Sequence, residues 1–261
     1  STPSNSSAAS DVYKRQLYRF SILFCTIGAI FSAGMFMFQW REYRMGEKAY
    51  ERLQENVLLG QQHDIPSSEE EMQILLPQVD FHELTGINPD VKGWLYCPDT
   101  PISYPICQGQ DNLYYLNHLL DGTQNSAGCL FLDSACEGFM ERNSVIYGHH
   151  MKNGTMFASL TKYEDQEYYD AHPDLFLLTP DGTYRIRLFS AYVAGMEDNS
   201  WQMDFASEAD YEAWLAEIQT RSCFKSQGLP EITDRVVTLS TCDYTFKNAR
   251  FVCHGWIENQ S

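Results

Sequence analysis

Three side chains in the second half of the sequence are of the types that a thiol-based active site needs. Cys242 ends the segment TLSTC at 238–242, His149 ends the segment VIYGH at 145–149, and Arg250 lies eight residues after the cysteine. A thiol attacks a carbonyl carbon, an imidazole transfers the proton, and a guanidinium stabilises developing negative charge. Each residue alone is weak support, because a cysteine or a histidine at a strand end is more often structural than catalytic.

Short apolar runs predict the strands that must position these side chains. Six runs, compact or alternating in polarity, have the pattern of β-strands. They are Cys129–Leu132, Val145–Tyr147, Leu175–Leu178, Tyr184–Val193, Val236–Thr241 and Phe251–Ile257. The turn sequence TPDG at 179–182 joins the third run to the fourth as a hairpin. Many short strands with few helices predict a closed or nearly closed β-barrel.

Two further segments, 41–59 and 207–221, have helical periodicity and an apolar face for core packing. The faces are Tyr50, Leu53, Val57 and Leu58 in the first segment, and Tyr211, Trp214, Leu215 and Ile218 in the second. Ser207, with Asp210 three residues later, is a helix-start signal of the capping type. The polar stretch Gln61–Glu71 is predicted to be a linker or loop, and the main domain is predicted to begin at Phe81.

The segment Phe20–Trp40 is predicted to cross a membrane. It holds 21 residues without a charge, and as a helix it spans about 30 Å, the thickness of a bilayer's hydrocarbon core. A cleaved signal peptide is the alternative, but the apolar run is long for one and no small-residue cleavage site follows Trp40. Three basic residues flank the segment on each side, so the positive-inside rule leaves its orientation open.

Charge and cysteine usage narrow the function further. The formal net charge of −17 argues against a nucleic-acid partner, because phosphate backbones are held by clustered Lys and Arg. The eight cysteines contain no CxxC pair, which argues against a zinc ribbon or a thioredoxin-like site. Seven of them lie outside the apolar segment, so at least one is free or pairs with another chain.

Taken together and in their order along the chain, these motifs resemble the sortase family. The family signature is a TLxTC strand end, a histidine after an apolar strand and an arginine on the following strand. Here these are TLSTC at 238–242, VIYGH at 145–149 and ARFV at 249–252. The serine of TLSTC resembles class B, as do GWLY at 93–96, DTPI at 99–102, DNLYYLNH at 111–118 and HHMKNGTMF at 149–157. The resemblance covers about residues 84–257.

The resemblance implies a mostly β fold, an eight-stranded sortase barrel with N-terminal helices and the helix at 207–221 inserted before the strand of Cys242. It also implies a type II anchor in the membrane of a Gram-positive-type cell. The expected organisation is a cytoplasmic segment at 1–19, an anchor at 20–40, a helical and linker region at 41–80 and an extracellular catalytic domain at 81–261. Residues 11–16 resemble adapter-derived sequence, and no second anchor is expected after Ile257.

For the activity, the resemblance implies a cysteine transpeptidase. Cys242 attacks the threonine carbonyl of a Pro- and Thr-containing sorting signal, of the NPxTx or LPxTG type, near the C-terminus of a surface protein. His149 protonates the departing amine, and Arg250 donates hydrogen bonds to the substrate or the oxyanion. The amine of a peptidoglycan precursor or a pilin then takes the acyl group from the thioester, and the chemistry needs no metal or cofactor.

The family has its catalytic histidine directly after the glycine, which selects His149 over His150. Successive strand residues face opposite sides, so His150 is expected at the rim or surface, where its replacement costs little. Tyr147 and Ser240 flank the catalytic residues and are expected to line the substrate groove. Asn117 is a weaker candidate for the same role.

Two other interpretations use the same residues. A cysteine endopeptidase would pass the acyl group to water instead of to an amine. A non-enzymatic surface domain would use His149, His150, Cys242 and His254 as metal ligands, although their spacing matches no zinc site. For Arg250 the alternative is a surface ion pair, which contributes less than about 1 kcal/mol.

Overall fold

The apolar runs of the sequence form a closed barrel of eight strands. The computed structural model describes residues 6–63, 75–243 and 245–258. The strand order around the barrel is β10-β8-β7-β3-β4-β5-β6-β9. In chain order the strands are β3 (Val91–Tyr96), β4 (Ser103–Cys107), β5 (Leu130–Leu132), β6 (Asn143–Tyr147), β7 (Asp174–Thr179), β8 (Gly182–Ala194), β9 (Arg235–Cys242) and β10 (Arg250–Ile257). The expected eight-stranded barrel is confirmed.

Two of the strand pairs are parallel and the other six are antiparallel. The parallel pairs are β4–β5 and β6–β9. Helical segments occupy several connections between the strands. They are α2 (Phe81–Ile87), η1 (Tyr114–Leu116), η2 (Phe157–Glu164), α3 (Gln166–Ala171), η3 (Asn199–Trp201) and α4 (Glu208–Thr220).

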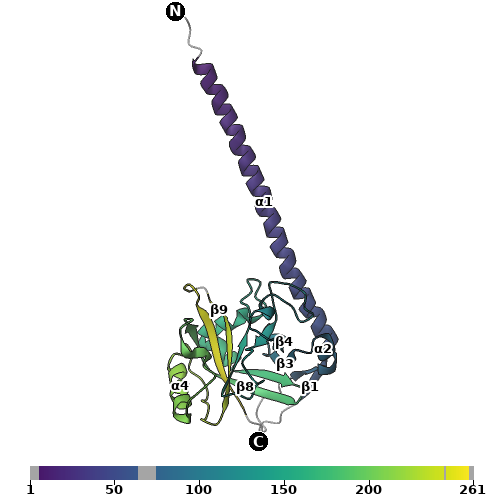
Figure 1. The fold of residues 1–261 in the computed structure, drawn as a ribbon, viewed down its shortest axis with the longest axis vertical. Helices are drawn as coiled ribbons and strands as arrows, with labels where there is room; N and C mark the ends of the chain where they lie inside the picture. Colours follow the sequence, from purple (N-terminus) through teal and green to yellow (C-terminus); the bar gives the residue numbers. More distant parts are fainter. Residues whose placement is uncertain (1–5, 64–74, 244, 259–261) are drawn as a thin grey trace, which may run out of the picture. The chain divides into compact units, whose positions relative to one another are not determined.

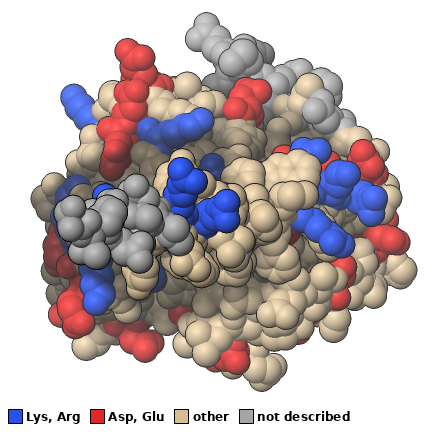
Figure 2. All heavy atoms as spheres, turned by 90° about the horizontal axis from the view of Figure 1, so that it is seen from above, with Lys and Arg blue, Asp and Glu red and all other residues tan. Residues whose placement is uncertain are grey.

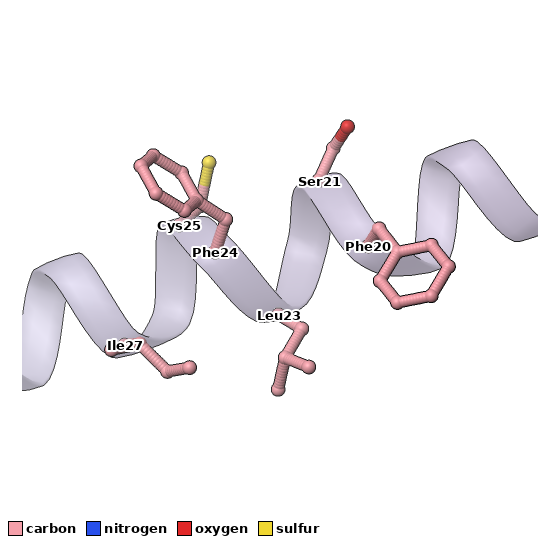
Figure 3. Close-up of a pocket in the computed structure, with 6 residues that line it drawn as sticks. All are labelled: Phe20, Ser21, Leu23, Phe24, Cys25 and Ile27. Carbon is pink, nitrogen blue, oxygen red and sulfur yellow. The ribbon is translucent and has the colours of Figure 1, made fainter.

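The N-terminal helix belongs to a separate compact unit over most of its length. The chain divides into Ser1–Met45 and Gly46–Ser261, and the described part of the first unit is the beginning of α1 (Ser6–Val57). This helix is long and apolar enough to cross a membrane, and none of its most apolar stretch is buried inside the structure. Figure 3 shows the side chains that border a hollow along residues 20–27, all of them projecting from this one helix. Such an apolar outer surface suits contact with lipid chains.

The second unit starts with the end of α1 and a small sheet. Tyr50, predicted to pack, is 6% exposed, and its hydroxyl donates to the carbonyl of Gly128 at 2.6 Å. The predicted helix extends two residues too far, to residue 59, because α1 ends at Val57 and β1 (Leu58–His63) begins at the next residue. This strand pairs with β2 (Leu75–Val79). The linker prediction is therefore wrong for residues 61–63, and residues 64–71 lie outside the described part.

Charged side chains of both signs lie on the face that Figure 2 shows, among a majority of uncharged ones. With 35 Asp and Glu against 18 Lys and Arg, the chain as a whole is acidic. Such a mixed and acidic surface keeps a protein soluble, and it differs from the clustered basic surfaces that hold phosphate backbones.

Helix α4 packs against strands β8, β9 and β10, of which β9 carries the cysteine, and Figure 1 shows it at this side of the barrel. Its start is capped as predicted, since the Ser207 side chain accepts from the backbone N–H of Asp210 at 3.2 Å. The predicted stripe is buried and packs with residues of β8, β9 and β10, among them Val236 and Val252. Burial of each large apolar side chain contributes about 1.5–3 kcal/mol. The interpretation of this stripe as core packing is confirmed.

A buried chain of polar side chains links four neighbouring strands, β6, β9, β10 and β8. The hydroxyl of Thr238 donates to Asn143 Oδ1 at 2.7 Å, so it must accept from Nδ1–H of His254, which lies 2.9 Å away. Nε2 of His254 is then the acceptor for the Tyr192 hydroxyl at 3.1 Å. Both ring nitrogens of His254 are therefore occupied within the protein, which argues against the metal-ligand role considered for this residue.

Burial, and secondarily the charge of Arg221, lowers the pKa of His254 to about 3. The unfolded chain binds a proton at this residue below about pH 6.5, whereas the folded chain does not until about pH 3. The contribution of the neutral ring to stability is thus fully present above pH 6.5 and is lost as the pH falls towards 3.

Replacing His254 with asparagine is expected to remove this pH dependence. In urea unfolding of the detergent-solubilised protein between pH 7 and pH 4, the wild type should lose up to about 1.4 kcal/mol per pH unit more than His254→Asn. The exposed His82 provides a matched control, because His82→Asn should keep the wild-type slope. Equal slopes for wild type and His254→Asn would contradict a buried neutral ring.

Candidate active site

Cys242 and Arg250 lie directly opposite each other on neighbouring antiparallel strands. They are Cα partners at the end of the β9–β10 ladder, and side chains of opposite residues share one face with Cβ atoms about 5 Å apart. Both residues are half-buried. The thiol and the guanidinium therefore project over the same surface, as the sequence analysis requires.

The parallel pairing of β6 with β9 brings His149 level with the cysteine. Tyr147 is the Cα partner of Ser240, and the N–H of Gly148 donates to the carbonyl of Ser240 at 3.1 Å. The recorded pairing ends at Tyr147, and extending its register by two residues would put His149 opposite Cys242. Partners in a parallel pair face the same side of the sheet, so we expect His149 on the face of the thiol.

A main-chain carbonyl fixes the proton on His149. Its Nε2 lies 2.7 Å from the carbonyl oxygen of Leu116. A carbonyl oxygen only accepts, so Nε2 carries the hydrogen and the neutral ring has its lone pair on Nδ1. The ring can therefore take up and release a proton at Nδ1 while the bond at Nε2 keeps its orientation. A base held by an orienting partner is the arrangement that nucleophilic catalysis uses.

The ring of His150 points to a different partner. Its Nδ1 lies 3.1 Å from the carbonyl oxygen of Cys242, and the residue is half-buried. The two histidines thus have different hydrogen-bond partners. Half-burial is compatible with the rim position expected for His150, and there its side chain contacts the main chain of the residue that bears the thiol.

Close packing around the histidines requires glycine at position 148. A Cβ there would lie 2.6 Å from Cδ2 of Phe157 and would collide with the side chain of Leu130. Met156 is fully buried at a φ of 57°, a region that residues with a side chain rarely adopt. The N–H of Phe157 donates to the carbonyl of His149 at 2.9 Å, so the chain folds back tightly at this point.

The known proteins that this chain is similar to agree with the geometry. A family described as Sortase domain matches residues 95–257. Sortase B of Listeria monocytogenes is 31% identical over 227 residues, which are 85% of this chain and 92% of that protein. The chain belongs to the sortase family. Sortases are cysteine transpeptidases, and the named relatives are of class B.

Solved structures give the same assignment. Sortase B from Bacillus anthracis in complex with AAEK1 has a TM-score of 0.72 at 32% identity, covering 85% of this chain and all of that one. The Staphylococcus aureus sortase B–substrate complex has a TM-score of 0.66 at 33% identity, covering 69% of this chain and 85% of that one. The barrel of this sortase is therefore the class B barrel.

The three residues expected to line the groove of this sortase differ in their surroundings. The Tyr147 hydroxyl donates to Asp133 Oδ2 at 3.0 Å, and burial followed by this carboxylate raises the pKa of the phenol. Ser240 is 2% exposed, and its hydroxyl accepts from Nε1 of Trp201 at 3.0 Å. Asn117 is exposed and directly follows Leu116, whose carbonyl holds His149.

Arg250 is available for a ligand. Its recorded hydrogen bond is to the carbonyl of the preceding Ala249, at 3.1 Å. Among the side chains that the structure describes, no carboxylate lies within the 4.0 Å of an ion pair with this guanidinium. The alternative of a surface ion pair therefore has no partner in the part of the sortase that the structure describes.

Sequence reasoning missed three contacts of the site. The carbonyl of Leu116 carries no side-chain signal, so no motif search finds it. Trp201 and Asp133 lie in connections far from Cys242 in the sequence, and their partners on β9 and β6 become visible only through the fold. A tryptophan in a polar stretch before a predicted helix was the one available hint.

Replacing Gly148 with alanine is expected to lower both activity and stability of this sortase. The added methyl group collides with Leu130 and Phe157 and displaces the histidine that follows. Overpacking costs about 1–3 kcal/mol, and a displacement of about 1 Å in a catalytic group costs about 100-fold in rate. Peptide cleavage and thermal unfolding measure the two effects.

Gly86 provides the matched control, because a Cβ at this helical position meets nothing within 4 Å. Gly86→Ala should leave the cleavage rate unchanged and stability equal or slightly higher. Wild-type activity and stability of Gly148→Ala would contradict this prediction, because they would show that Leu130 and Phe157 can move aside without cost.

Proposed function

We propose that this sortase cleaves a sorting signal near the C-terminus of surface proteins, with Cys242 as nucleophile, and transfers the acyl group to an amine. The observation that supports this most strongly is the pairing of Cys242 with Arg250 across the β9–β10 ladder. The Leu116 carbonyl fixes the hydrogen of His149 on Nε2, which leaves Nδ1 free to act as the acid and base of the reaction.

In the first half of the reaction the Cys242 thiolate attacks the carbonyl carbon of the signal's threonine. A carbon–sulfur bond forms, and the negative charge moves to the oxygen, where the Arg250 guanidinium can donate to it. The carbon–nitrogen bond then breaks. An amine cannot leave as its anion, so protonated His149 gives its Nδ1 proton to the departing nitrogen.

In the second half an amine attacks the thioester. His149, now neutral at Nδ1, takes the proton of the attacking nitrogen, and Cys242 leaves as thiolate. The Nε2–H bond to Leu116 stays in place through both halves, because only Nδ1 changes its protonation. The expected acceptor is a peptidoglycan precursor or a pilin amine. For the substrate of the first half, one similar solved structure is a sortase B–substrate complex.

For the location, we propose that α1 anchors the enzyme as a type II membrane protein with the barrel outside the cell. The apolar stretch of the helix supports a membrane span. An extracellular barrel would meet both its surface-protein substrate and a cell-wall amine on the same side of the membrane.

Replacing Cys242 with alanine is expected to abolish cleavage of a peptide that carries the matching sorting signal, because the thioester can no longer form. With the wild type, mass spectrometry should find the acyl group on Cys242. Adding triglycine should shift the product from the free acid to the amide, which separates a transpeptidase from a hydrolase.

Cys223 is the matched control, since it is an exposed cysteine of the same unit that lies in the connection between α4 and β9, outside the strand that bears Cys242. Cys223→Ala should retain the wild-type rate. Near-normal turnover by Cys242→Ala, or acylation of another cysteine, would refute the assignment of the nucleophile.

Substitutions of Arg250 separate hydrogen-bond geometry from charge. Arg250→Ala should lose about 10² to 10³-fold in the rate of cleavage, as for an oxyanion donor. Arg250→Lys keeps the charge but not the planar fork of donors, so it should recover only a small part of the loss. Steady-state cleavage of the peptide gives the rates.

Arg235, at the opposite end of β9, is the control arginine. Arg235→Ala should remain within a few-fold of wild type. Full rescue by Arg250→Lys would mean that the positive charge alone acts on Cys242, and an unaffected Arg250→Ala would remove this residue from the site.

A further inference from the structure

His150 makes a contact that the reaction scheme above does not use. Its Nδ1 lies 3.1 Å from the carbonyl oxygen of Cys242, and a carbonyl can only accept, so Nδ1 carries the hydrogen. We propose that His150 is a positioning residue that holds the end of β9 and thereby the direction of the Cys242 thiol. This inference rests on the proposed role of Cys242 as the nucleophile.

The ladder between β6 and β9 explains why a side chain is needed at this point. The last recorded backbone bond of this ladder runs from the N–H of Gly148 to the carbonyl of Ser240. In a regular parallel ladder the next bond of this kind would run from the N–H of residue 150 to the carbonyl of Cys242. The imidazole of His150 supplies a donor to that same carbonyl.

The chain leaves the ladder here because it folds back on itself. The carbonyl of His149 accepts from the N–H of Phe157 at 2.9 Å, and His150 forms an isolated bridge with Met156. The turn thus draws the backbone of His150 into pairing with Met156, and its ring reaches back to the strand that it has left. The carbonyl of the last β9 residue would otherwise lack this donor.

The consequence for the thiol follows from the position of Cys242 as the final residue of β9. On the other edge, the strand end is held by pairing with Arg250. Loss of the His150 bond frees one of the two edges, so the final peptide plane can rotate and carry the thiol with it. Nδ1–H is present in both the neutral and the charged ring, so the tether holds in either state.

The test compares donors of the same reach. Asparagine has its amide nitrogen the same number of bonds from Cα as Nδ1 of histidine, whereas alanine has no donor. His150→Ala should lower kcat for peptide cleavage about 10-fold with little change in KM, because a misdirected thiol reacts more slowly once the substrate is bound. His150→Asn should return kcat to within about threefold of wild type.

The same substitution at His149 provides the contrast. An acid/base group cannot be replaced by an amide, so His149→Asn should lose about 10² to 10⁴-fold. If His150→Asn were as impaired as His150→Ala, the ring would act through more than its Nδ1 donor and the positioning role would be refuted. Wild-type kcat in His150→Ala, with an unchanged melting temperature, would refute it as well.

A second measurement is independent of any sorting signal. In a background of Cys25→Ser and Cys223→Ser, which removes the two exposed cysteines, a methanethiosulfonate reagent reports the reaction rate of Cys242. The thiolate reacts, and neighbouring cations stabilise it only when it is correctly placed. His150→Ala should therefore slow the modification about threefold or more, and His150→Asn should restore it.

The two measurements separate the inference from the proposed function. A wild-type enzyme that cleaves no sorting-signal peptide, but whose thiol still responds to His150 in this way, would refute the function and leave the positioning role intact. If the enzyme cleaves the peptide, but His150→Ala changes neither kcat nor the modification rate, the positioning role is refuted and the proposed function is kept.

Discussion

Strand β9 is hydrogen-bonded along both edges, antiparallel to β10 and parallel to β6, and the site depends on this double pairing. The nucleophile candidate Cys242 ends the central strand, Arg250 begins one neighbour, and His149 lies two residues beyond the end of the other. None of the three is carried by a long flexible loop. Their backbone positions follow from ladder registers that form cooperatively over five or more residue pairs, which is how groups from distant parts of a chain can be held to within a fraction of an ångström.

The two faces of β9 support this arrangement in different ways. Residues at even positions lie under α4, where Val236 packs in an apolar cluster and Thr238 joins the buried chain to His254. Further along the same face, Ser240 accepts from Trp201 just before the chain reaches the thiol. Odd positions such as Leu239 are fully buried on the opposite face, inside the barrel. A strand that is covered on both faces and paired on both edges has little freedom until its last residue.

Much of this organisation could be predicted from the sequence. Strands β5 to β10 are predicted from apolar runs and one turn signal, and α4 from its cap and its stripe. In contrast, β3 and β4 were missed as local patterns, because Gly93 and Pro105 interrupt them. The three candidate side chains were named from their types and order. Contacts made by main-chain atoms, such as the carbonyl that holds His149 and the carbonyl of Cys242 that His150 contacts, have no signature in residue types.

The acceptor for His149 is a peptide carbonyl and not a carboxylate, and this has a consequence for how the site can vary among descendants of the gene. Every residue type carries a carbonyl, so codon changes at position 116 can alter the side chain without removing the acceptor, provided that the new side chain still fits the partly buried site of Leu116. Insertions or deletions between β4 and β5 would shift the carbonyl itself. Selection on this contact should therefore act on the length of that connection far more than on the identity of the residue within it.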